Sequence, residues 1–78
     1  MTAYSEAIKA HLADADLQVQ EFAEMLGVKQ PTVTRYKEGE RFPDAEMARK
    51  IEMATGGKVS FELWLSIFKE RVGLGEAA

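Results

Sequence analysis

The sequence has no cysteine and a single histidine, His11, among its 78 residues. It therefore can form neither a disulfide framework nor a thiolate zinc site, and one imidazole is too few for a histidine-based metal site. A Ser-His-Asp relay is equally poorly supported, and neither a nucleophile–base pair nor a glycine-rich phosphate loop is visible. We expect a protein that is not an enzyme and that uses no metal and no cofactor.

Long apolar runs are also missing. The longest ones span a few residues, far fewer than the roughly 20 that a helix needs to cross a bilayer. The start of the chain lacks the charged segment and apolar block of a secretory leader. A chain of 78 residues has room for one domain, near the size at which a single core only just offsets chain entropy. We expect one soluble, cytoplasmic domain over residues 1–78, with no membrane partner.

Hydrophobic periodicity predicts an all-α chain of five helices. The first should cover about residues 3–13, followed by a polar break at residues 14–16. One face of this helix collects its apolar residues Tyr4, Ala7, Ile8 and Leu12. His11 is assigned to the polar side of the helix and is expected to be exposed.

Two short helices should follow. The second helix begins after Gln18, with Glu21 placed to complete an imperfect capping box. It ends at Gly27, because glycine adopts the left-handed conformation that terminates a helix. Pro31 suits the first turn of the third helix, where its missing N–H costs nothing, and Gly39 ends that helix.

The last two helices are separated by a glycine pair. Asp44 caps the fourth helix, and Gly56 with its neighbour ends it. The fifth helix should span about residues 61–72 and stop at Gly73. Residues 75–78 are then expected to form a flexible tail.

The last helix carries two apolar stripes, which is more apolar surface than one small core needs. We expect it to act as a dimerisation element. Its candidate interface residues are Phe61, Leu63, Trp64, Ile67 and Phe68. Each of these side chains has an alternative role in closing the core of the monomer.

Positive charge is scarce, and its location is informative. The formal net charge is −3, whereas basic character is the usual footprint of nucleic-acid binding. Residues 29–41 form the one net-positive segment, with four cations against two carboxylates. Such a cluster is often only a solvated face. Its coincidence with the third helix and the turn after it favours a nucleic-acid contact.

Residues 23–39 carry the pattern Ala-x-x-x-Gly-Val-x-Gln-Pro-x-Val-x-Arg-Tyr-x-x-Gly. This pattern resembles the helix-turn-helix of the phage Cro and repressor class, the lambda-repressor-like fold. Residues 51–60, IEMATGGKVS, are similar to the Cro group called YdaS-like. The resemblance covers about residues 17–60 and implies a five-helix DNA-binding bundle with its helix-turn-helix at about residues 18–38.

The resemblance also implies which residues contact DNA. The third helix would lie in the major groove with its N-terminal half at the base edges. The base-reading residues would be Gln30, Pro31, Thr34 and Arg35, of which Gln30 suits adenine and Arg35 suits guanine. A second set would hold phosphates and fix the register of the protein on the duplex. This phosphate set comprises Gln18, Gln20, Lys29, Thr32, Lys37 and Arg41.

Two positions depart from the family pattern. The family commonly has glutamine at the first position of the second helix, where this chain has Val19 between Gln18 and Gln20. It also commonly has a serine or threonine cap before the third helix, where this chain has Lys29. The third helix therefore lacks a side-chain acceptor worth about 1 kcal/mol.

These features support two functional hypotheses. The first is a sequence-specific transcriptional regulator, a Cro-type repressor of phage or prophage type that binds a near-palindromic DNA operator as a homodimer. The alternative is an antitoxin-type module that binds a toxin or another protein partner through its last helix and autoregulates through DNA binding. A homodimer reading two half-sites favours the first, and a monomer in solution favours the second.

Overall fold

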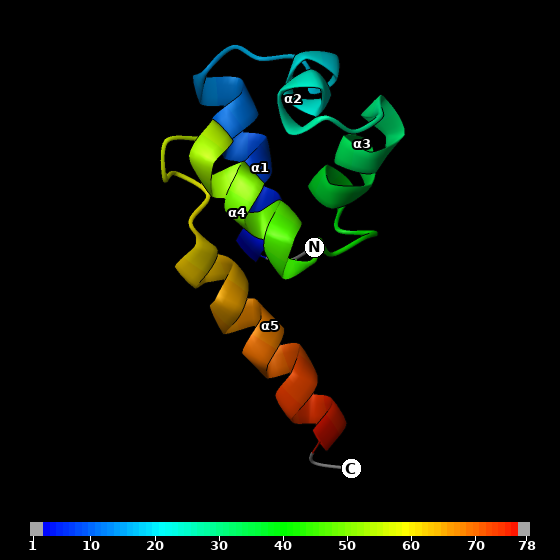
Figure 1. Cartoon of the computed structure of the whole chain (residues 1–78), viewed down its shortest axis with the longest axis vertical. Coiled ribbons are helices and arrows are strands. Elements are labelled where there is room, and N and C mark those ends of the chain that lie inside the picture. The colour runs from blue at the N-terminus through cyan, green and yellow to red at the C-terminus, as the bar shows by residue number, and fades with distance from the viewer. Residues whose placement is uncertain (1–2, 77–78) are drawn as a thin grey trace.

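Five α-helices form the described part of the chain, residues 3–76, in a computed structural model whose side chains are described through residue 70. The helices are α1 (Ala3–Asp14), α2 (Val19–Leu26), α3 (Gln30–Glu38), α4 (Ala45–Ala54) and α5 (Phe61–Glu76). Residues 3–76 contain no strand, so the predicted all-α, five-helix architecture is confirmed (Figure 1). None of these helices is long and apolar enough to cross a membrane.

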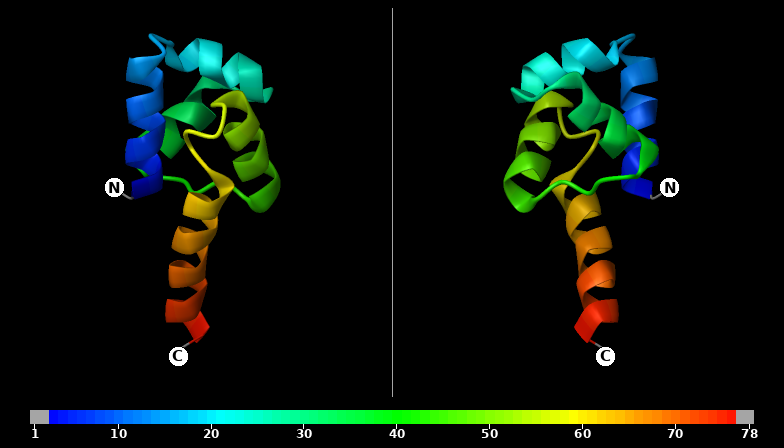
Figure 2. Two further views of the ribbon diagram at one scale, coloured as in Figure 1. Left: turned by 90° about the vertical axis from the view of Figure 1, so that its left-hand side faces the viewer. Right: turned by 90° about the vertical axis from the view of Figure 1, so that its right-hand side faces the viewer.

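The first four helices pack into a bundle from which α5 projects (Figures 1 and 2). Helix α3 packs against α1 and α2, and α4 packs against α2. Helix α5 contacts α4 and α1 and then runs away from the bundle, which explains why one dimension of the molecule is 41 Å and the other two are 22 and 20 Å. The described chain therefore presents two separate surfaces, one on the four-helix bundle and one on the projecting helix.

Local capping interactions set both ends of α2 and the start of α4 where the sequence predicts them. The backbone N–H of Gln18 donates to Oε1 of Glu21 at 2.9 Å, which is one half of a capping box at the start of α2. Gly27 has φ +74° and ends α2 in the left-handed conformation. Asp44 accepts a hydrogen bond from the Met47 backbone N–H at 2.8 Å and caps α4. These bonds involve residues close in sequence, so the sequence pattern predicts them well.

Replacing Gly27 by alanine should destabilise the fold by about 1 kcal/mol, because a Cβ is disfavoured at positive φ. Apart from Gly27 and its two chain neighbours, no described residue has an atom within 4 Å of the Cβ that would be added, so the loss would come from the backbone conformation. Urea denaturation measures this effect. Gly27→Asn is the control and should lose less, since asparagine tolerates the left-handed region. Equal stability of wild type and Gly27→Ala would contradict the capping role.

The hydrophobic core lies between the four bundle helices and is closed by the start of α5. Its fully buried side chains come from every part of the bundle and from the loop before α5. The largest of them are Tyr4, Ile8, Phe22, Val33, Ile51 and Val59. All of these elements therefore contribute side chains to one continuous hydrophobic core.

His11 is buried, so its predicted exposure on the polar side of α1 was wrong. Only 8% of the residue is exposed, and its ring centroid lies 6.0 Å from that of Phe22. His11 follows Tyr4 by seven residues, close to two helical turns, and therefore shares its face. Ala7, which was assigned to that face, is only half-buried. The buried face of α1 is rotated from the predicted one toward His11.

Helix α5 is longer than predicted. It continues through Gly73 to Glu76, so the predicted end near residue 72 and the stop at Gly73 were wrong. Glycine inside a helix costs about 1 kcal/mol relative to alanine, which weakens a helix without ending it. The predicted tail at residues 75–78 overlaps the end of α5, and residues 77–78 lie outside the described residues.

The segment at residues 51–60 fixes the start of α5. Thr55 is buried, and its hydroxyl oxygen accepts a hydrogen bond from the buried Val59 backbone N–H at 3.1 Å. The Glu52 carboxylate accepts a hydrogen bond from the Phe61 backbone N–H at 3.0 Å. The end of α4 is thereby tied to the first residue of α5, and the projecting helix leaves the bundle in a defined direction.

Candidate nucleic-acid interface

Helices α2 and α3 form a helix-turn-helix around a tight turn at residues 27–29. The backbone N–H of Val28 donates to the carbonyl of Ala23 at 3.0 Å, and that of Gly27 donates to the carbonyl of Glu24 at 3.2 Å. Ala23 is buried, and its small side chain allows the two helices to approach each other closely. The turn therefore holds α3 at a fixed angle to α2.

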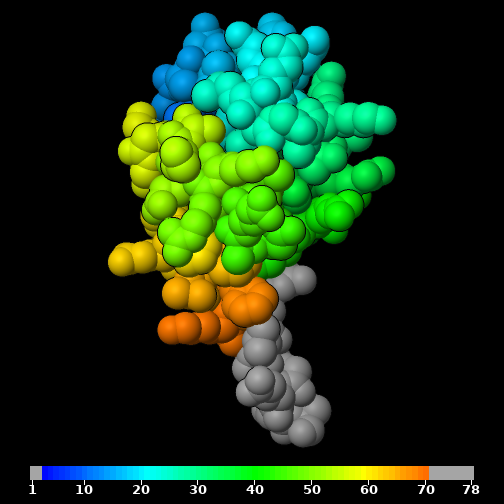
Figure 3. Space-filling view, in the orientation of Figure 1, coloured from blue at the N-terminus to red at the C-terminus, as the bar shows by residue number. Residues whose placement is uncertain are grey.

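Helix α3 has a buried face and an exposed face. Val33 and Tyr36 are buried against the bundle. On the opposite side, Gln30, Pro31 and Arg35 are exposed. Figure 3 shows side chains of the α3 segment projecting outward at one side of the molecule. Three of the four predicted base-reading residues therefore lie where a ligand can reach them.

Thr34, the fourth predicted base-reading residue, is less available. It is half-buried, and its hydroxyl donates to the Gln30 carbonyl one turn earlier at 3.2 Å. A threonine hydroxyl bonded in this way has its proton engaged inside the helix. Its methyl group is then the part suited to an apolar contact, such as the thymine methyl.

The predicted phosphate-binding residues lie around α3 and at the start of α2. Gln18, Gln20, Lys29 and Arg41 are exposed. Thr32 and Lys37 are half-buried. Amide and cationic side chains at these places are the groups that commonly contact DNA phosphates.

The turn after α3 holds Arg41 close to that helix. The backbone N–H groups of Glu40 and Arg41 both donate to the carbonyl of Arg35, at 2.9 and 3.3 Å. Burial raises the pKa of the Tyr36 phenol above its usual value, and the positive charge of Arg41 partly opposes this increase. Arg41 therefore lies close enough to Tyr36, near the end of α3, for the two side chains to interact electrostatically.

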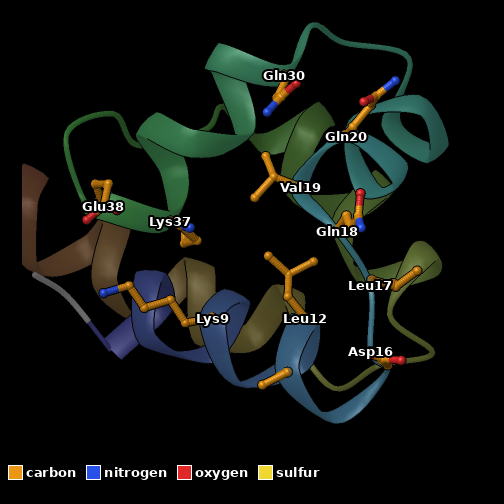
Figure 4. A pocket seen from close by; sticks show the side chains of 11 residues that line it. Lys9, Leu12, Asp16, Leu17, Gln18, Val19, Gln20, Gln30, Lys37 and Glu38 are labelled. Carbon is orange, nitrogen blue, oxygen red and sulfur yellow. The ribbon is translucent and has the colours of Figure 1, made fainter.

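A groove of about 680 Å³ opens between the end of α1, the start of α2 and α3 (Figure 4). Four residues predicted to contact DNA line it, namely Gln18, Gln20, Gln30 and Lys37. Lys9 of α1 also lines the groove, although it lies outside the helix-turn-helix and was not among the predicted site residues. The one signal for it in the sequence is that Lys9 is the only lysine or arginine of residues 1–28.

The structure divides the five dimer candidates on α5 between core and surface. Trp64 and Ile67 are buried in the monomer, so the alternative core role applies to them. Phe61 and Leu63 are half-buried, and Phe68 is 39% exposed. Phe68 is therefore the candidate with the most surface available to a partner.

Trp64 anchors α5 to the bundle. Its indole stacks on Phe42, with ring centroids 5.6 Å apart, on Phe61, at 5.1 Å, and on Phe68, at 4.8 Å. Its Nε1–H donates to the buried backbone carbonyl of Pro43 at 2.8 Å. These contacts connect α5 to the turn that follows α3. They therefore fix the orientation of α5 relative to α3.

Comparison with known proteins identifies the family. A helix-turn-helix family model, HTH_3, matches residues 8–61, which is more than half of the chain and includes all of α2 and α3. No curated protein and no solved structure matches the sequence. The turn geometry, the exposed face of α3 and this match agree, and the chain belongs to the broad lambda-repressor and Cro-like helix-turn-helix family of DNA-binding regulators.

Proposed function

We propose that this protein is a sequence-specific repressor of the Cro type that binds a near-palindromic operator with α3 in the major groove. The exposed face of α3 carries the proposal, because it presents Gln30, Pro31 and Arg35 opposite the buried Val33 and Tyr36. A helix that packs against its own domain along one side and is polar and exposed along the other can insert into a major groove.

The exposed side chains suit base recognition. The Arg35 guanidinium can donate two hydrogen bonds to O6 and N7 of one guanine, and the Gln30 amide can pair with N6 and N7 of one adenine. The net charge of −3 limits how many phosphates each subunit can neutralise. Specific binding would therefore depend on a small number of base contacts.

A homodimer supplies the length of DNA that one helix cannot read. Two copies of α3 related by a two-fold axis and about 34 Å apart would enter successive major grooves on one side of the duplex. Support for dimer formation comes from α5, which projects from the bundle and leaves Phe68 exposed. Dimer formation through α5 and assignment to the YdaS-like phage or prophage group are parts of this proposal.

The same helix supports a second candidate function. An antitoxin-type module would use the exposed side of α5, including Phe68, to bind a toxin or another protein, and would use α3 to regulate its own gene. Light scattering of the purified protein separates the two proposals. A stable dimer is expected for the repressor, and a monomer at micromolar concentration would favour the antitoxin.

The proposed function is tested by selecting bound duplexes from a random DNA library. We expect a motif with two half-sites related by two-fold symmetry and about one helical turn apart. A single asymmetric motif would overturn the homodimer while retaining DNA recognition. Absence of any enriched motif would overturn the proposed function as a whole.

Replacing Lys29 by serine should have opposite effects on folding and on DNA binding. Among the described residues, no side chain caps the start of α3, so serine at position 29 should stabilise the fold by about 0.5–1 kcal/mol. We define the salt slope as the steepness with which the logarithm of the DNA-binding constant falls with the logarithm of the salt concentration. Loss of a phosphate contact should lower this slope by about 0.9 per subunit. Thermal unfolding and salt-dependent anisotropy titrations measure the two effects. Lys58→Ser, at an exposed loop position, should change neither. An unchanged salt slope for Lys29→Ser would contradict the phosphate role.

A further inference from the structure

We propose that the groove between α1, α2 and α3 binds the DNA backbone, with Lys9 of α1 as a phosphate contact and with Asp16 and Glu38 opposing the phosphate. All three residues line the groove together with the residues already assigned to DNA. This inference rests on the proposed function. It deepens that function by adding α1 to the interface and by identifying groups that weaken DNA binding.

The groove collects hydrogen-bond donors from three helices. Lys9 reaches it from α1, Gln18 and Gln20 from the start of α2, and Gln30 and Lys37 from α3. In Figure 4, Gln20 and Gln30 lie on one side of the opening and Lys9 lies on the other. Ammonium and amide N–H groups that converge in this way match the oxygen acceptors of a phosphodiester.

The groove is continuous with the exposed face of α3. Gln30 belongs to both, because it lines the groove and also lies at the start of the exposed face. A strand whose bases meet Gln30 and Arg35 would therefore carry its backbone past the opening of the groove. Lys9, which is half-buried and lines that opening, can meet the phosphate from the side opposite α3.

Two carboxylates in the same groove oppose this contact. Asp16 and Glu38 are both exposed. They line the groove together with two lysines, Lys9 and Lys37. Acidic groups beside a phosphate weaken binding to every DNA sequence equally. They therefore lower the affinity for operator and random DNA by the same factor, so that the base contacts of α3 are needed for binding at low protein concentration.

The test uses two substitutions that should act in opposite directions. Lys9→Gln should raise Kd on both the selected site and random DNA by about threefold to tenfold, and should lower the salt slope by about 0.9 per subunit. Asp16→Asn should lower Kd on both by about the same factor. Asp16 has φ +53°, a conformation that asparagine also adopts, so this change removes charge and preserves backbone shape.

Two further variants separate an electrostatic effect from a folding defect. Lys9→Arg should restore the wild-type salt slope, and Lys50→Gln, at an exposed position on α4 outside the groove, should leave Kd unchanged. A wild-type Kd and slope for Lys9→Gln, or weaker binding by Asp16→Asn, would overturn the groove proposal. Wild-type protein that selects no DNA motif would instead overturn the proposed function, so the two failures are distinguishable.

Discussion

Replacement of Trp64 by alanine should destabilise the folded protein by about 3–5 kcal/mol, the loss typical of a large buried aromatic side chain. Trp64 is 3% exposed, and its ring stacks on Phe42 and Phe68. Its removal would also leave the Pro43 carbonyl without its indole partner. Since Trp64 joins α5 to the bundle, we expect the backbone amides of α5 to lose hydrogen-exchange protection.

Trp64→Phe is the matched variant, because it retains a ring for stacking and removes the donor to Pro43. It should lose less stability than Trp64→Ala, as measured by urea denaturation. If α5 also forms the dimer interface, Trp64→Ala should shift the protein toward monomer in light scattering. A stability loss below about 1 kcal/mol for Trp64→Ala would contradict the anchoring role.

Replacement of Arg35 by alanine should weaken operator binding by about 1–3 kcal/mol and should remove the preference for one base pair in each half-site. Arg35 is exposed on the face of α3 opposite Val33, so the fold should retain its stability. The measurement is a comparison of Kd for the selected site with Kd for variants of that site at each position.

Lys37→Ala is the control for a contact that does not recognise sequence. Lys37 lines the groove beside α3 and should bind phosphate, so its loss should weaken all DNA sequences to a similar degree. Arg35→Ala should instead weaken operator binding more than binding to random DNA. Equal losses on both kinds of DNA for Arg35→Ala would contradict its base-reading role.

The sequence predicts the helix-turn-helix well because the signals that form it are local. Glu21 caps the start of α2 from three residues away, and Gly27 ends the helix by its own conformation. Pro31 occupies the first turn of α3, as its missing N–H favours. Periodicity then separates the buried Val33 from the exposed Arg35.

The features that the sequence does not predict depend on distant contacts. Which stripe of α5 is buried depends on Trp64 meeting the Pro43 carbonyl, 21 residues earlier in the chain. The burial of His11 depends on how α1 is rotated against Phe22. Lys9 joins the candidate interface only because α1 packs beside α3, and no local pattern indicates that contact.

Contact between Arg35 and a guanine in the major groove can be tested directly with a base analogue. Each guanine of the selected site is replaced in turn by 7-deazaguanine, which lacks the N7 acceptor. We predict that one replacement in each half-site weakens wild-type binding and has no further effect on Arg35→Ala, so that the two changes are not additive. Additive losses at every guanine would contradict the proposed contact between Arg35 and guanine, since they would show that Arg35 acts elsewhere.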